Sequence, residues 1–166
     1  IADSLFRFAQ REHAGQMRRF IESRVLQNQL DITEAENRAR RFSEEYGVIS
    51  LPDQVAALVD QMAEVEGELR ALDMQIGATS EILGPDHSSV RELQVKRTQL
   101  ATQRRRLLDS QNEGSVDPFL TFGDVPQRAI EYLRLERELK IQTIIQELLY
   151  QQYEIAKLEE ARHVSS

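Results

Sequence analysis

The chain has 166 residues, a net charge of −7, 30% charged and 40% hydrophobic residues, and no cysteine. An acidic chain lacks the net basic face that phosphate backbones require, so we expect no nucleic-acid partner. The absence of cysteine excludes disulfides, thiolate-bound zinc and thiol catalysis, and no apolar run reaches the ~20 residues that span a bilayer.

The composition is typical of long helices that bury a narrow seam, because aromatic residues make up only 6% of the chain and tryptophan is missing. We predict an all-α fold, an elongated antiparallel coiled-coil bundle of about four long helices in a single domain, 1–166. The expected helices are about 3–46, 53–83, 88–112 and 126–162. Since the chain begins at Ile1 without a methionine, we expect it to be a fragment excised from a longer protein.

The first segment carries a heptad seam and ends in a strong stop signal. Its seam residues follow alternating steps of four and three: Ile21, Val25, Asn28, Ile32, Ala35, Ala39, Phe42 and Tyr46. Asn28 either fixes the register as a buried polar residue or lies at a solvated edge. Gly47, with Pro52 shortly beyond it, predicts the end of this helix.

The second segment has the most regular heptad in the chain. Its seam residues are Leu51, Val55, Leu58, Met62, Val65, Leu69, Leu72, Ile76, Thr79 and Leu83. Gly67 and Gly77 lie off this seam, and we interpret them as exposed glycines that weaken the helix; the alternative is that they permit close approach of a neighbour. Gly84 and Pro85 then break the chain.

The third segment is predicted to pair with the second, and Asp86 or Ser88 is the expected cap at its start. Residues 53–83 hold seven acidic residues and one basic residue, a net of −6, whereas residues 86–112 hold six basic and three acidic residues, a net of +3. Antiparallel pairing would place these opposite charges beside the seam. The basic run 104–106 is therefore interpreted as a solvated face paired with the acidic segment, with an anionic polymer or phospholipid as the alternative partner.

The fourth segment begins at Pro126, after an irregular stretch in which Phe119, Leu120 and Phe122 either pack onto the bundle or contact a partner. Its apolar residues cover more than a narrow stripe, which implies contact with more than one helix. The residues that we expect to pack within the bundle or between subunits are Leu148, Leu149, Tyr153 and Ile155.

No catalytic chemistry is encoded in a recognisable pattern. His13, His87 and His163 are far apart in the sequence, each without a second ligand at zinc-binding spacing, so we interpret them as structural or solvent-exposed. The chain has no phosphate-binding loop, dinucleotide-binding motif or nucleophile elbow. We therefore predict that it is not an enzyme and that it uses no cofactor or metal.

Three blocks of the sequence resemble the periplasmic helical region of the polysaccharide co-polymerases, the Wzz-type chain-length determinants. The first block runs from residue 30 to Pro52 and ends in the aromatic–glycine stop at residues 46–47 followed by Leu51-Pro52. The second is the turn at residues 83–87, where Ser88 stands in place of the family's usual proline. The third block is marked by Tyr132, Leu135, Arg137, Leu148, Gln151, Gln152, Tyr153, Glu154, Glu160 and Ala161, although Gln146 occupies a position that is often aromatic and Tyr150 supplies an aromatic one turn later.

The resemblance implies a non-enzymatic scaffold in lipopolysaccharide or exopolysaccharide biosynthesis. Members of this family are anchored in the bacterial inner membrane on both sides of a periplasmic region, form homo-oligomers, and set how far a polysaccharide polymerase extends the growing glycan. Some exopolysaccharide relatives are fused to, or work with, a cytoplasmic tyrosine kinase. The membrane segments would lie outside this chain.

Two other functions fit the same helical pattern. One is the helical hairpin adaptor of a membrane-fusion protein in an export or efflux system, which would be flanked by β-rich lipoyl-like halves. The other is a cytosolic coiled-coil tether, which would lack membrane segments altogether. The flanking sequence discriminates among the three.

Overall fold

The computed structural model describes residues 1–51, 53–113 and 127–165. Four helices account for 93% of this part of the chain, and it contains no strand, so the all-α prediction is confirmed. The helices are α1 (Ala2–Tyr46), α2 (Asp53–Leu83), α3 (Ser88–Glu113) and α4 (Gln127–Val164). Each of these bounds lies within two residues of the bound expected from the sequence. As far as the structure describes them, none of the helices combines the length and the apolar content that crossing a bilayer needs.

Two glycines mark the breaks between the first three helices. Gly47 follows the end of α1 with a φ of 83°, and Gly84 follows the end of α2 with a φ of 97°. Both values lie in the left-handed region, which glycine adopts without a Cβ penalty. The other expected breaks, Pro52 and Pro126, lie outside the described residues, as do the aromatic and leucine residues of the connection, Phe119, Leu120 and Phe122.

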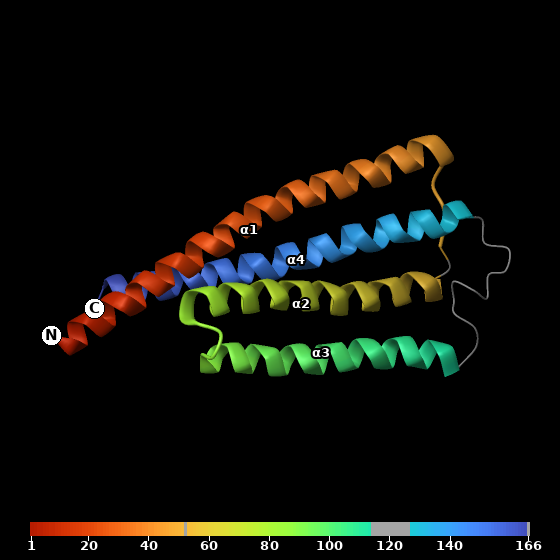
Figure 1. Cartoon of the computed structure of the whole chain (residues 1–166). Helices are drawn as coiled ribbons and strands as arrows, with labels where there is room; N and C mark the ends of the chain where they lie inside the picture. The colour runs from red at the N-terminus through yellow and green to blue at the C-terminus, as the bar shows by residue number, and fades with distance from the viewer. Residues whose placement is uncertain (52, 114–126, 166) are drawn as a thin grey trace.

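The helices lie side by side in the spatial order α1, α4, α2, α3 (Figure 1). Chain direction alternates from each helix to the next in sequence, so that α4 runs antiparallel to α1 and parallel to α2. Short connections led us to expect that consecutive helices would be the main antiparallel neighbours. That expectation was wrong for two of the three pairs. Helix α4 lies between α1 and α2 along much of their length, and α3 packs on α2 alone within the described residues.

The seam predicted for α1 is the face that this helix buries. Ile21, Val25, Asn28, Ala35 and Phe42 are all buried, and Phe42 stacks at a tilt against Tyr132 of α4, with ring centroids 5.9 Å apart. A heptad of apolar residues faces one partner helix, and here that partner is α4 rather than the following helix α2.

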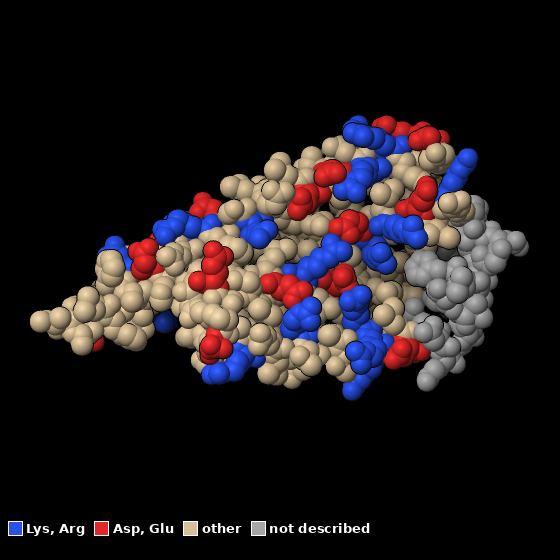
Figure 2. Space-filling view, viewed as in Figure 1, with Lys and Arg blue, Asp and Glu red and all other residues tan. Residues whose placement is uncertain are grey.

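The charge pairing predicted between α2 and α3 is present. Arg97 of α3 forms an ion pair with Asp73 of α2, and Arg104 Nε lies 3.3 Å from Glu66 Oε2. Both pairs follow the short apolar contact made by Val90 and Leu93, which are buried at the start of α3. On the face drawn in Figure 2, acidic and basic side chains intermingle over all four helices. Exposed pairs of this kind favour one register and add little stability.

Candidate functional site

The centre of the molecule is an apolar cluster built around α4. Ile141, Ile145 and Leu149 of α4 are each only 1% exposed and pack with Ile21 and Val25 of α1. Their spacing of four residues places them on one helix face. The structure therefore places one of the predicted packing residues, Leu149, inside the core of this chain. A second, Tyr153, is partly buried against the same cluster.

A stripe of small residues on α2 lets α4 approach closely. Every member is buried, and the spacing of four or seven residues places all of them on one face: Ala63, Gly67, Ala71 and Ala78. A Cβ built on Gly67 would lie 2.7 Å from Ile144 Cγ2 and 3.4 Å from the carbonyl oxygen of Ile141. The interpretation of Gly67 as an exposed glycine was therefore wrong, whereas Gly77 has no neighbouring atom within 4 Å of such a Cβ.

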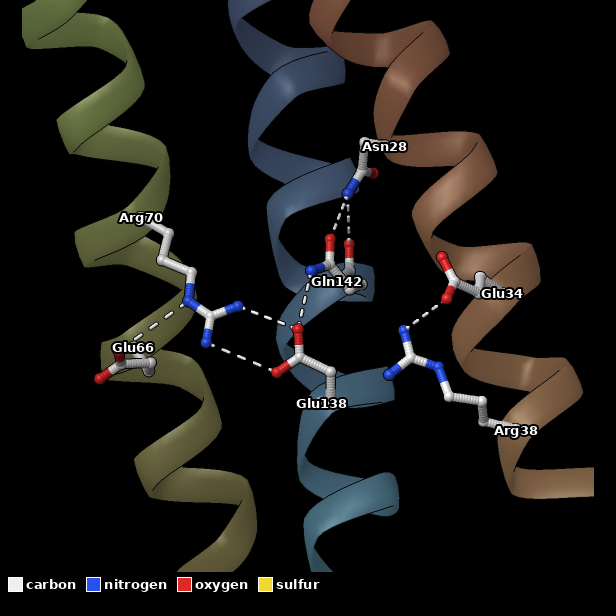
Figure 3. Close-up of polar contacts among 7 residues, drawn as sticks. All are labelled: Asn28, Glu34, Arg38, Glu66, Arg70, Glu138 and Gln142. Carbon is white, nitrogen blue, oxygen red and sulfur yellow. Dashed lines mark hydrogen bonds and ion pairs between the residues drawn. The ribbon is translucent and has the colours of Figure 1, made fainter. Parts of the chain in front are cut away.

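A chain of polar contacts joins α1, α4 and α2 beside the apolar cluster (Figure 3), and an ion pair extends it to α3. Asn28 of α1 is 3% exposed, and its Nδ2 donates to the backbone oxygen of Gln142 at 3.3 Å and to its Oε1 at 2.9 Å. Gln142 Nε2 donates to Glu138 Oε1 at 2.9 Å, and Arg70 Nη1 of α2 donates to the same oxygen at 3.0 Å. Glu66 lies one turn before Arg70 on α2 and forms ion pairs with Arg70 and with Arg104 of α3, which extends the polar contacts to α3. Asn28 is thus a buried polar member of the seam, which is one of the two alternatives left open by the sequence.

The polar chain holds Glu138 in its ionised form. Burial by itself would raise the pKa of this carboxyl group, but hydrogen bonds from Gln142 and Arg70 and the positive charges of Arg70 and Arg137 outweigh it. The net effect is a pKa below the ordinary value of 4.5. A polar layer of this kind, buried at Asn28 and half-buried elsewhere, favours one alignment of the helices along their axes, because a slipped register would separate its donors from its acceptors.

A groove of about 580 Å³ runs between α2 and α4. Its carboxylates come from both helices, namely Asp60, Glu64, Glu68, Glu136 and Glu147, and its apolar lining is Leu139, Ile144 and Leu148. Lys140, which also lines the groove, forms an ion pair with Asp60. Burial, followed by the charge of Glu64, raises the pKa of the Glu68 carboxyl group. We call this surface the α2–α4 groove, and its chemistry suits an amphipathic segment that carries positive charge.

The apolar line of the groove continues along α4 as exposed surface. Leu148 lies in the groove, and Ile155, two helical turns later on the same face, is 57% exposed. Leu158 follows within one turn and is also exposed. The four packing residues predicted for α4 thus fall into two groups. Leu149 and Tyr153 pack within the chain, whereas Leu148 and Ile155 lie on a face that α1, α2 and α3 leave open.

The three histidines, interpreted as separate surface or structural residues, lie together in the fold. His13, His87 and His163 all line one pocket at the end of the molecule that holds both termini. Antiparallel packing of α1 and α4 brings residue 13 near residue 163, and His87 in the turn after α2 lines the same pocket. Among the described residues, no three His, Asp or Glu side chains are arranged to hold one metal ion.

Sequence reasoning missed the small-residue stripe and the histidine pocket for different reasons. Alanine and glycine contribute little to a hydrophobic periodicity, although close helix packing depends on them. The histidine pocket depends on which helices become neighbours, and no local pattern gives that information. No protein-family model, curated protein or solved structure matches this chain.

Proposed function

We propose that this chain is the periplasmic helical stalk of a Wzz-type polysaccharide co-polymerase, a non-enzymatic scaffold of the bacterial inner membrane. Copies of the stalk form a wall of elongated antiparallel coiled-coil rods, and the size of that wall regulates how far the polymerase extends an O-antigen or exopolysaccharide chain. The sequence blocks around residues 46–52, 83–87 and 126–161 support the family assignment.

The observation that carries the scaffold proposal is the division of apolar residues on α4. Leu149 is 1% exposed in the core, while Ile155 is 57% exposed on a face that continues the α2–α4 groove. Helix α4 has already buried one face within this chain. Burying its second apolar face would stabilise an assembly in which another chain covers that face. Leu148, Ile155 and Leu158 are therefore assigned to contacts between subunits.

Charge complementarity supports α3 of a neighbouring copy as the surface that fits this groove. The groove has five carboxylates and one lysine. Helix α3 lies at one edge of the molecule, packs on α2 alone within the described residues, and exposes its remaining basic side chains, Arg91, Lys96, Arg105 and Arg106. Because groove and α3 are different surfaces, the contact between copies is heterologous, and repeated contacts of this kind form a ring when the rotation between copies closes.

The test uses the full-length, membrane-anchored protein in a bacterium whose own chain-length determinant has been deleted. The wild-type protein restores a modal glycan length, and we expect the double variant Ile155→Asp, Leu158→Asp to give unregulated lengths. The matched control is Leu26→Asp, because Leu26 is equally exposed at 59% but lies on α1. A normal modal length in the double variant would contradict the proposal.

Assembly and glycan control are separated by measuring both properties of each variant. If the double variant loses its oligomeric state and its modal length together, the two are linked as proposed. If wild-type protein assembles but restores no modal length, the rods form a scaffold with another function. Circular dichroism of each purified variant verifies that its helices remain folded.

A further inference from the structure

The fold gathers every histidine of this chain at one pocket. The pocket has a volume of about 450 Å³. His13 comes from α1, His163 from α4, and His87 from the turn that joins α2 to α3. Its apolar walls come from the N-terminal part of α1 and from the end of α2: Phe6, Met17, Ile82 and Leu83. His13 and His163 are half-buried at this pocket, whereas His87 is exposed at its edge.

His87 has a structural task in addition to lining the pocket, because it is the residue that caps α3. Its backbone oxygen accepts hydrogen bonds from Val90 N at 3.0 Å and Arg91 N at 3.3 Å. Its side-chain Nδ1 accepts a hydrogen bond from Ser89 N at 3.1 Å. This is the geometry of a helix N-cap, in which a side-chain acceptor satisfies the second free N–H of the helix. The expectation that Asp86 or Ser88 would cap this helix was therefore wrong.

A histidine can act as an N-cap only while its Nδ1 carries no proton. Protonated imidazole has an N–H on both nitrogens and accepts no hydrogen bond. The protonated His87 would direct a donor at the Ser89 N–H and would also place a positive charge at the positive end of the α3 dipole. Both effects oppose the start of α3, so proton binding and helix capping exclude one another at this residue.

We propose that the three-histidine pocket is a proton-binding site that releases the start of α3 when the surroundings become acidic. The charged and titratable groups that line it are His13 from α1, Glu159 and His163 from α4, and His87 from the turn. The two lining residues from α2, Ile82 and Leu83, are uncharged. Three imidazolium groups would face one carboxylate, so their mutual repulsion adds to the loss of the cap.

The position of α3 allows it to separate without loss of the core. This helix packs on α2 alone within the described residues, and the central cluster draws all its buried members from α1, α2 and α4. Detachment of the start of α3 would expose Val90 and Leu93, its two buried apolar residues. Histidine is the side chain whose charge ordinarily changes between about pH 5 and 8, which sets the range of the response.

The experiment is amide hydrogen exchange on this chain at about pH 7.5 and about pH 5.5, expressed as protection factors that remove the intrinsic effect of pH. We expect the protection of Ser89, Val90 and Arg91 to fall by roughly threefold to tenfold at the lower pH, the size of effect given by loss of an N-cap. Amides of α4 around Ile141 serve as the internal reference and should change little.

The control variant is His87→Asn, which keeps a side-chain acceptor at the cap but cannot take up a proton in this range. We expect this variant to protect the start of α3 equally at both pH values. A second variant, His163→Gln, removes one imidazole far from the cap in sequence and should reduce the response without abolishing it. Unchanged protection in the wild-type chain at the lower pH, or the same loss in His87→Asn as in the wild type, would overturn the proposal.

Discussion

Gly67 of α2 lies against Ile144 of α4 so closely that a Cβ on the glycine would come 2.7 Å from Ile144 Cγ2 and 3.0 Å from Ile144 Cβ. Both atoms belong to the stiff, branched part of the isoleucine side chain, which has one strongly preferred rotamer in a helix. The carbonyl oxygen of Ile141 lies 3.4 Å away on the same side. The spacing of α2 and α4 is therefore set by the absence of a side chain at residue 67.

We predict that Gly67→Ala lowers the free energy of unfolding by about 1–2 kcal/mol, because overpacking outweighs the gain in helix propensity. Gly77→Ala is the matched control, since Gly77 lies in the same helix with nothing within 4 Å of an added Cβ. It should raise the free energy of unfolding by up to about 1 kcal/mol. Urea denaturation measures both changes, and equal stabilisation by the two substitutions would show that α4 does not approach Gly67 closely.

The second prediction concerns the buried amide of the α1 seam. Asn28 Oδ1 is buried without a hydrogen-bond partner, although Nδ2 of the same side chain is paired. Asn28→Leu should raise the free energy of unfolding by about 1 kcal/mol, because it removes an unsatisfied polar group and buries apolar surface. Asn28→Ala, which leaves a cavity, should be about 2 kcal/mol less stable than the leucine variant. A leucine variant that is less stable than wild type would mean that the amide contributes more through Gln142 than we infer.

The third prediction uses two glutamates whose pKa values move in opposite directions. The pKa of Glu138 is lowered, so its ionised form stabilises the fold above about pH 4.5, and this contribution is lost as the pH falls through the lowered value. Glu138→Gln should therefore lower the free energy of unfolding by about 1 kcal/mol at neutral pH. This loss is smaller than for a fully buried charged pair, because Glu138 is partly exposed. As the pH falls below the lowered pKa of Glu138, the variant and the wild type should converge.

Glu68 should show the reverse dependence. Its pKa is raised by burial and by Glu64, so the ionised form opposes folding at neutral pH and this cost disappears as the pH falls below about 4.5. Glu68→Gln should stabilise the protein at neutral pH by a few tenths of a kcal/mol, with no gain in acid. Thermal unfolding followed at several pH values measures both variants, and the same sign of effect for the two at neutral pH would contradict the assignment.

The fourth prediction tests the charge match between copies by exchanging its signs. Arg105→Glu with Arg106→Glu on α3 should weaken self-association of the full-length protein, because the introduced carboxylates would face the carboxylates of the groove. Glu64→Lys with Glu147→Lys should weaken it similarly. Combining all four substitutions should restore association. Sedimentation in detergent provides the measurement, and a quadruple variant no better than either pair would argue against contact between the two surfaces.

Heptad patterns in the sequence predicted the positions of the helices and the buried face of α1, because a run of apolar residues at steps of three and four forms one stripe on one helix. They could not predict which helix covers that stripe. Ile21 and Val25 pack mainly on α4 rather than on the following helix α2. The small-residue stripe around Gly67, which lets α4 lie close to α2, contributes little to a hydrophobic pattern. The association of His13 with His163 follows from that same choice of neighbours.

Photo-crosslinking tests the central claim, that α4 carries a surface for another subunit, most directly. The chain has no cysteine, so once any cysteine outside this chain is replaced, a benzophenone maleimide can be attached at Ile155→Cys alone in the full-length protein in native membranes. We expect an efficient crosslinked dimer from this position and little from Leu26→Cys, whose exposure is similar. Equal yields from the two positions, or no dimer from Ile155→Cys, would contradict the claim.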